Sequence, residues 1–218
     1  MEILAFLLAG LFILLGFVLG GNFIINRWHR RWLAHVAKRV GGRLHDGSWL
    51  ELPEMTLRCG YFGARVTFEG DGKASSQTVF RIPWIEEQLR CEVRQRGVIE
   101  GLLRLPNEQP IEMAAPLLDA GYVVTGNEEL KIRRLFSARV QSALIQLARL
   151  APVPYRKHPD VHMVIEDGLV TITKASHIVD EPTVEQFIRL CAELHDAALH
   201  ELSSAVARSV VPPSKSCA

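Results

Sequence analysis

The chain has 218 residues, of which 48% are hydrophobic, and its 25 Lys and Arg against 24 Asp and Glu give a formal net charge of +1 at pH 7. From Leu44 onward 19 basic and 23 acidic residues remain, so this part lacks the positive surplus expected of a nucleic-acid-binding protein. The four cysteines form no CxxC pair, which excludes a zinc knuckle or a redox dithiol motif and suits a reducing compartment.

The first element is an uncharged run over residues 3–26 that is rich in Leu, Ile, Phe and Val. At about 1.5 Å per helical residue this run exceeds the roughly 30 Å of a bilayer core. A removable signal peptide would carry basic residues before the apolar run, whereas only Met1 and Glu2 precede this one. We therefore expect residues 1–26 to be a single-pass transmembrane anchor.

Small residues repeat along one face of this expected helix. Gly16 and Gly20 form a GxxxG motif, and Ala5 and Ala9 continue the stripe. Such a face allows close helix approach and predicts a homodimer through the transmembrane helix. The alternative is that these residues reflect only the ordinary abundance of Gly and Ala in membrane helices.

Residues 27–43 contain six basic residues and no acid. Because Lys and Arg mark the cytoplasmic flank, this charge predicts an outside N-terminus and a cytoplasmic domain. The segment reads either as a basic amphipathic helix along the membrane surface or as a plain stop-transfer flank. Its membrane-contacting residues are expected to be Arg27, Arg30, Arg31, Trp28 and Trp32, with both indoles at headgroup level.

Residues 44–207 are expected to form an α+β domain of antiparallel sheet covered by two long helices. Alternating apolar and polar residues predict strands near residues 56–59, 65–69, 77–84 and 89–96, arranged as a meander with one buried face. Cys59 and Cys91 fall on the apolar side and are expected to be core cysteines. Residues 98–111, with two prolines, are a candidate internal connector.

The outward face of the predicted sheet carries an unusual number of arginines. Guanidinium groups near a membrane suit phospholipid headgroups or other anions. The alternative is a solvated face whose arginines pair with acids such as Glu86 and Glu87. The candidate anion- or lipid-binding residues are Arg58, Arg65, Arg81, Arg90, Arg94 and Arg96.

The second half predicts a short strand over 121–125, a helix over about 128–150, a hairpin over 161–173 and a final helix from about residue 181. The core stripe of the final helix is expected to be Val184, Phe187, Ile188, Cys191, Leu194, Ala198 and Leu202. A capping box is expected to open the first helix, with Thr125 as its N-cap and Glu128 closing it. Asp167 and Gly168 supply the two hairpin-turn residues. Residues 208–218 have no periodicity and are expected to be a disordered tail.

One motif suggests chemistry. His158, Asp160 and His162 alternate along an extended segment, so their side chains would project to one side, and such groups suit zinc or a related metal. His177 would be a fourth ligand. The plainer interpretation is polar residues on the wet face of a strand. On the final helix, Cys191 and His195 are expected to pack together rather than form a nucleophile and base.

No common catalytic or nucleotide-binding motif occurs after the anchor, and no cofactor is implied. The sequence therefore predicts a non-catalytic interaction or scaffold domain, held at the cytoplasmic membrane face, that binds a protein partner or anionic lipid. The alternative is a membrane-tethered metal-dependent hydrolase that uses His158, Asp160 and His162.

Overall fold

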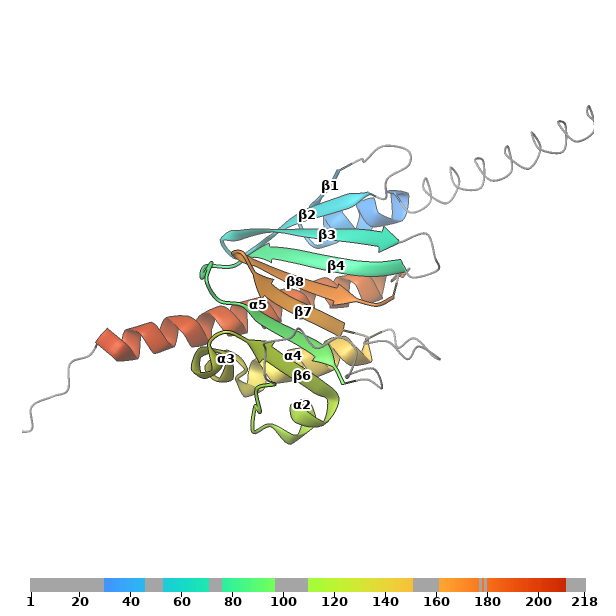
Figure 1. Cartoon of the computed structure of the whole chain (residues 1–218). Helices are drawn as coiled ribbons and strands as arrows, with labels where there is room; N and C mark the ends of the chain where they lie inside the picture. Colours follow the sequence, from blue (N-terminus) through green and yellow to red (C-terminus); the bar gives the residue numbers. More distant parts are fainter. Residues whose placement is uncertain are drawn as a thin grey trace, which may run out of the picture.

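The computed structural model describes residues 30–45, 53–70, 76–96, 110–150, 161–176, 178 and 180–210. Within these residues the protein is α+β, as expected, with one antiparallel sheet and helices against it (Figure 1). Its strands are β1 Arg43–His45, β2 Glu54–Cys59, β3 Phe62–Gly70, β4 Ser76–Pro83, β5 Cys91–Gln95, β6 Tyr122–Gly126, β7 Val161–Glu166 and β8 Leu169–Lys174. Its helices are α2 Pro116–Gly121, α3 Glu129–Leu135, α4 Ala138–Arg149 and α5 Glu181–Val210, and residues 30–39 are also helical.

The eight strands lie in the order β1-β2-β3-β4-β8-β7-β5-β6. The sequence predicted that β4 and β5 are neighbours in a four-strand meander, and this is wrong for β5. The β7–β8 hairpin inserts between them, so that β4 pairs with β8 and β5 pairs with β7 and β6. Because β8 and β7 bridge β4 and β5, all eight strands form one continuous sheet.

Two-residue turns close two of the hairpins. Asp167 and Gly168, with φ of 51° and 71°, join β7 to β8, and Glu166 pairs with Leu169 as expected. Positive φ at both positions is what a type I′ turn requires, so the Asp-Gly prediction is confirmed. In the β2–β3 hairpin the first turn residue is Gly60, with φ of 58°.

The core lies between one face of the sheet and the helices behind it in Figure 1. Alternate strand residues such as Val66, Phe80 and Ile172 are fully buried on this face. The predicted stripe of α5 packs against them, and all seven of its members are buried: Val184, Phe187, Ile188, Cys191, Leu194, Ala198 and Leu202. Burial of this stripe explains why a strongly periodic sequence forms a long helix here.

The helix over residues 30–39 belongs to this core. Leu33, Val36 and Ala37 are buried, and the Trp32 ring packs edge-on against Phe68 at 6.5 Å. The prediction that Trp32 lies at headgroup level is therefore wrong, because its indole is 9% exposed inside the domain. The apolar side of this amphipathic helix faces the sheet, and the predicted domain boundary at Leu44 falls inside β1.

The helix predicted over 128–150 is broken into α3 and α4. The break lies at Phe136 and Ser137, whose backbone angles leave the helical region, and Gln141 Nε2 donates to the freed Phe136 carbonyl at 2.7 Å. The predicted capping box is also wrong. Glu128 occupies the N-cap position of α3 and makes no side-chain capping bond, because its carboxylate binds Lys131.

Several predictions fall outside the described residues. These are the anchor with Gly16 and Gly20, the flank residues Arg27 and Trp28, most of the connector, and the tail beyond Val210. Helix α5 extends to Val210, past the expected end at residue 207. Among the described helices, none combines the length and apolar character needed to cross a membrane.

Candidate anion-binding face

The second face of the sheet carries most of the polar strand side chains and faces away from α5 (Figure 1), although Val79 on β4 and Val123 and Thr125 on β6 are buried there. Strand register places one residue from each strand in a single row across this open face. From β1 to β6 the row is Arg43, Thr56, Arg65, Arg81, Thr171, Val164, Glu92 and Thr125. Hydroxyl and guanidinium groups dominate the first five positions, so this half of the face is rich in hydrogen-bond donors.

The six arginines predicted to share this face fall into two groups. Arg58, Arg65 and Arg81 lie on the neighbouring strands β2, β3 and β4. Strand β5 is three strand spacings from β4, about 14 Å away, because β8 and β7 intervene. Arg90, Arg94 and Arg96 therefore lie on or beside β5, apart from the first group.

Three arginines surround Thr56 at the β1 edge of the open face. Arg43 pairs with Thr56 from one side and Arg65 from the other, and Arg58 lies two residues along β2. All three are exposed, and the Thr56 hydroxyl donates to the Arg43 carbonyl at 3.4 Å and lies 2.9 Å from His45 Nε2. We call Arg43, Arg58 and Arg65 the arginine cluster.

Sequence reasoning missed Arg43, because it was counted with the charges of the membrane flank. The signal that could have identified it is the short alternation of Arg43, Leu44 and His45 after two glycines, which is the pattern of an edge strand. In the cluster Glu54 is the nearby acid, and its carboxylate lies 3.6 Å from Arg65 Nε. Arg43 and Arg58 form no ion pair within the described residues, so the cluster keeps a positive charge.

Arg81, in contrast, is held by neighbours on β3. Its guanidinium lies 2.7 Å from the Glu69 carboxylate and donates to Thr67 Oγ1 at 2.9 Å. Burial acts to raise the pKa of Glu69, but hydrogen bonds from Arg81 and Thr67, with the charge of Arg81, lower it below its ordinary value. Arg81 is therefore largely committed to the protein itself.

The β5 group sits beside a histidine and a carboxylate. His162 on β7 bonds Glu92 on β5, with 2.8 Å between Nε2 and Oε1, and Arg94 pairs directly with His162. The hydrogen bond from His162 lowers the pKa of Glu92 despite its partial burial. The expected partners Glu86 and Glu87 do not serve these arginines, since Glu86 binds Lys131.

The predicted metal ligands are only partly visible. His158, Asp160 and His177 lie outside the described residues, and the imidazole of His162 is bonded to Glu92. Across the ranges that the structure describes, no three side chains of His, Cys, Asp or Glu come together as a metal site would require. The described chain thus offers no observation in favour of the hydrolase alternative.

The three cysteines that the structure describes lie in the core, as expected, together with His195. Cys59, Cys91 and Cys191 are buried, and burial raises the pKa of the Cys59 thiol to about 11 and that of Cys191 well above its ordinary value. The His195 ring lies against Phe62 and Trp84, with centroid distances of 5.3 and 5.8 Å. A buried, protonated thiol is a poor nucleophile, which argues against cysteine catalysis.

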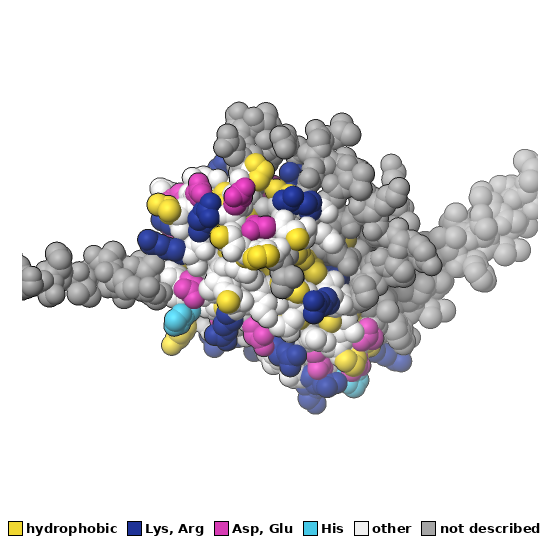
Figure 2. Space-filling model, turned by 90° about the horizontal axis from the view of Figure 1, so that it is seen from below, with side chains coloured by type: hydrophobic (Ala, Val, Ile, Leu, Met, Phe, Trp, Pro, Cys, Tyr) yellow, Lys and Arg dark blue, Asp and Glu magenta, His cyan; other side chains and the backbone are white. Residues whose placement is uncertain are grey.

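Besides Trp32, two of the predicted membrane-flank residues, Arg30 and Arg31, lie within the described residues and belong to the surface of the domain. Arg30 is half-buried and Arg31 is exposed on the outer side of the helix over residues 30–39. Figure 2 shows the molecule from below, the side nearest α2, α3 and β6, where basic and acidic side chains are interspersed.

Comparisons with known proteins give one similar fold. No protein-family model matches the chain, and no curated protein matches its sequence. The crystal structure of the mycobacterial trehalose monomycolate transport factor A, TtfA, is similar with a TM-score of 0.53. The match has 12% sequence identity and covers 77% of this chain and 92% of that chain. At this identity the similarity is one of fold.

Proposed function

We propose that the protein is a non-catalytic accessory protein of the cell membrane whose α+β domain binds anionic lipid through the arginine cluster. Residues 1–26 anchor it, with the N-terminus outside and the domain on the cytoplasmic side. The observation that carries the proposal is the convergence of Arg43, Arg58 and Arg65 around Thr56 on the sheet face that points away from α5. A guanidinium group can donate two parallel hydrogen bonds to the oxygens of one phosphate, and the cytoplasmic leaflet supplies anionic headgroups.

The fold supports an accessory role. The similar structure is described as a transport factor for trehalose monomycolate, and by analogy with it we assign this chain a transport-related accessory role. The basic flank around residues 27–43 adds to the attraction of the domain for an anionic surface.

The proposal is tested by vesicle flotation of a chain that begins at residue 30, so that the anchor cannot insert. Wild type should float with phosphatidylcholine vesicles that contain phosphatidylserine, and should not float with phosphatidylcholine alone. Each cation near an anionic surface contributes about 1 kcal/mol, so R58A/R65A should weaken binding about 30-fold.

A matched control removes two arginines from α3. R133A/R134A changes the net charge equally but lies away from the cluster, and we expect nearly wild-type binding. Absence of binding by the wild type at low salt, or an equal loss in both double variants, would remove the arginine cluster as a lipid site.

A further inference from the structure

The exposed large hydrophobic side chains of the described residues gather at one end of the sheet. They are Tyr61, Ile85, Leu130 and Leu169, with exposed fractions of 101%, 55%, 74% and 36%. Tyr61 lies in the β2–β3 turn, Ile85 just after β4 and Leu169 just after the β7–β8 turn, while Leu130 starts α3. We call this region, with the loop over residues 84–90, the turn end. Isolated exposed hydrophobic residues are ordinary, but their concentration at one end indicates a contact surface.

Three of these residues border one strip of the open face. Pro83 on β4 is exposed and pairs directly with Leu169 on β8. Gly63 on β3 continues the strip toward Arg58, with which it pairs. A Cβ built at Gly63 would meet no atom within 4 Å, so the surface is open above this glycine. The strip therefore offers a stretch of strand between Tyr61 and Leu169 whose exposed side chains are small or apolar, with open space above Gly63.

The strip is rigidly supported from below. His195 on α5 is fully buried, and its Nε2 donates to the Pro83 carbonyl at 3.1 Å. The Trp84 amide donates to the Gly168 carbonyl at 2.7 Å, which ties the end of β4 to the β7–β8 turn. A surface fixed in this way loses little conformational freedom when a partner binds.

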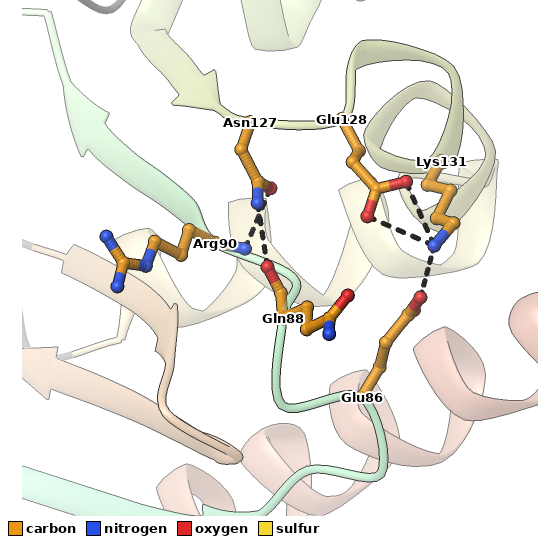
Figure 3. Close-up of polar contacts among 6 residues, drawn as sticks. All are labelled: Glu86, Gln88, Arg90, Asn127, Glu128 and Lys131. Atoms are coloured by element: carbon orange, nitrogen blue, oxygen red, sulfur yellow. Dashed lines mark hydrogen bonds and ion pairs between the residues drawn. The ribbon is translucent and has the colours of Figure 1, made fainter.

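The loop that carries Ile85 is braced from α3 (Figure 3). Asn127 Oδ1 accepts a hydrogen bond from the Arg90 amide at 2.9 Å, and its Nδ2 donates to the Gln88 carbonyl at 2.7 Å. Lys131 bridges Glu86 in the loop and Glu128 at the start of α3. These contacts hold the loop in place while the Ile85 side chain stays exposed. Packing in the protein's own core therefore does not account for an apolar residue at this position.

Acidic side chains lie beside the Leu169 side of this strip. Glu166 and Asp167 are exposed at the β7–β8 turn, and Glu87 lies beside Gly168 in the same turn. None of the three forms an ion pair within the part of the chain that the structure describes. Arg58 and Arg90 are the nearby bases, so the three acids exceed the two bases. A partner that fits this surface is basic and carries an apolar anchor.

The turn end is opposite to the end at which the preceding chain joins the domain (Figure 1). The helix over residues 30–39 begins beside the far end of β3, where Trp32 packs against Phe68. Arg39 on this helix pairs with Glu181 and Glu185 in the first turns of α5, at 3.6 and 2.8 Å. The turn end therefore lies away from residue 30, and its exposed acids Glu87, Glu166 and Asp167 suit a basic protein partner better than an anionic lipid surface.

From these observations we infer that the turn end is a docking surface for a basic segment of a partner protein. Tyr61, Ile85 and Leu169 provide the apolar contact, and Glu87, Glu166 and Asp167 provide the opposite charge. This interaction is independent of lipid binding by the arginine cluster.

The test is photo-crosslinking of the full-length chain in its own membrane, with a benzophenone amino acid at position 61. A second chain carries the probe at Arg189, which is exposed on α5, as a control for random contact. We expect position 61 to crosslink one protein, through a peptide rich in Lys and Arg, and position 189 not to crosslink it.

Two variants test the specificity of this crosslink. E87K/E166K reverses the charge, and G63Q fills the open strip without an internal clash. Each should reduce the yield at least about tenfold at an unchanged melting temperature. Crosslinks from position 61 only to lipid or to a second copy of the chain, an acidic crosslinked peptide, no crosslink, or a yield insensitive to both variants would each overturn the inference.

Discussion

Arg65 on β3 lies directly opposite Arg81 on β4, so two positive side chains face each other across adjacent strands. Like charges in this position destabilise a sheet unless acids compensate them. Arg81 is compensated closely by Glu69 at 2.7 Å, whereas Arg65, 67% exposed, has only Glu54 at 3.6 Å. Arg81 therefore has a structural role, whereas the side chain of Arg65 is free to turn toward a ligand.

This division predicts unequal effects of two carboxyl-to-amide substitutions. E69Q should lower the free energy of unfolding by about 1 kcal/mol, because Arg81 loses its carboxylate while still facing Arg65. E54Q removes the longer, exposed contact between Glu54 and Arg65 and should change the free energy of unfolding by less than about 0.5 kcal/mol. Urea unfolding of both variants at pH 7 measures the difference. Equal losses would show that Arg81 is not held as described.

A pair of glycines provides a test of packing at the end of β6. A Cβ at Gly126 would lie 2.3 Å from the Arg90 carbonyl oxygen and 2.4 Å from Ile132 Cδ1, whereas one at Gly63 meets nothing within 4 Å. G126A should therefore lower the free energy of unfolding by about 2 kcal/mol or more. G63A should be neutral or slightly stabilising, because alanine restricts the unfolded chain. Thermal melts of the two variants compare them directly, and similar melting temperatures would contradict the close approach at Gly126.

The helix over residues 30–39 makes a prediction about where the folded unit begins. A chain that starts at residue 30 should unfold cooperatively, whereas one that starts at Leu44 loses four buried residues, namely Trp32, Leu33, Val36 and Ala37. Burial of each large apolar side chain contributes about 2 kcal/mol, and whole domains are stable by only about 5–15 kcal/mol. We expect the shorter chain to be aggregated or unfolded by circular dichroism. A cooperative transition at the same temperature in both chains would show that this helix is dispensable.

The sequence predicts local features of this fold better than distant ones. The Asp167–Gly168 turn and the stripe of α5 are confirmed, because turn chemistry and a repeat of three or four residues act within a short segment. The position of β5 was wrong, because alternation shows which residues of a strand are buried but not which strand lies beside it. Pairing of β4 with β8 joins residues about 90 positions apart, such as Arg81 and Thr171.

The same limit applies to the candidate site. Alternation correctly placed Arg58, Arg65 and Arg81 on a polar face, yet the six predicted arginines fall into two separate groups. Arg43 was counted with the membrane flank because the helix before it, which follows an apolar run, has the same amphipathic pattern whether it lies on a membrane or packs on a sheet. Only tertiary contact, as between Trp32 and Phe68, distinguishes the two cases.

His195 predicts how stability responds to acid. Its ring is fully buried, and burial lowers its pKa below the ordinary value of 6.5, although the Pro83 carbonyl and Asp196 act in the opposite direction. As the pH falls through about 6.5, the unfolded chain therefore takes up this proton before the folded protein does. The free energy of unfolding should be independent of this group above that pH and fall below it, with a slope of at most about 1.4 kcal/mol per pH unit.

The H195Q variant isolates this contribution, because glutamine can still donate to the Pro83 carbonyl but does not titrate. Urea unfolding at pH 7.5, 6.5 and 5.5 measures this. Between pH 6.5 and 5.5 the free energy of unfolding of wild type should fall relative to that of H195Q. Glu69 and Glu92 have pKa values lowered from 4.5, so their contributions are lost only at more acidic pH and do not enter this window. Parallel curves for wild type and H195Q would mean that the buried imidazole accepts a proton as readily as it does in the unfolded chain.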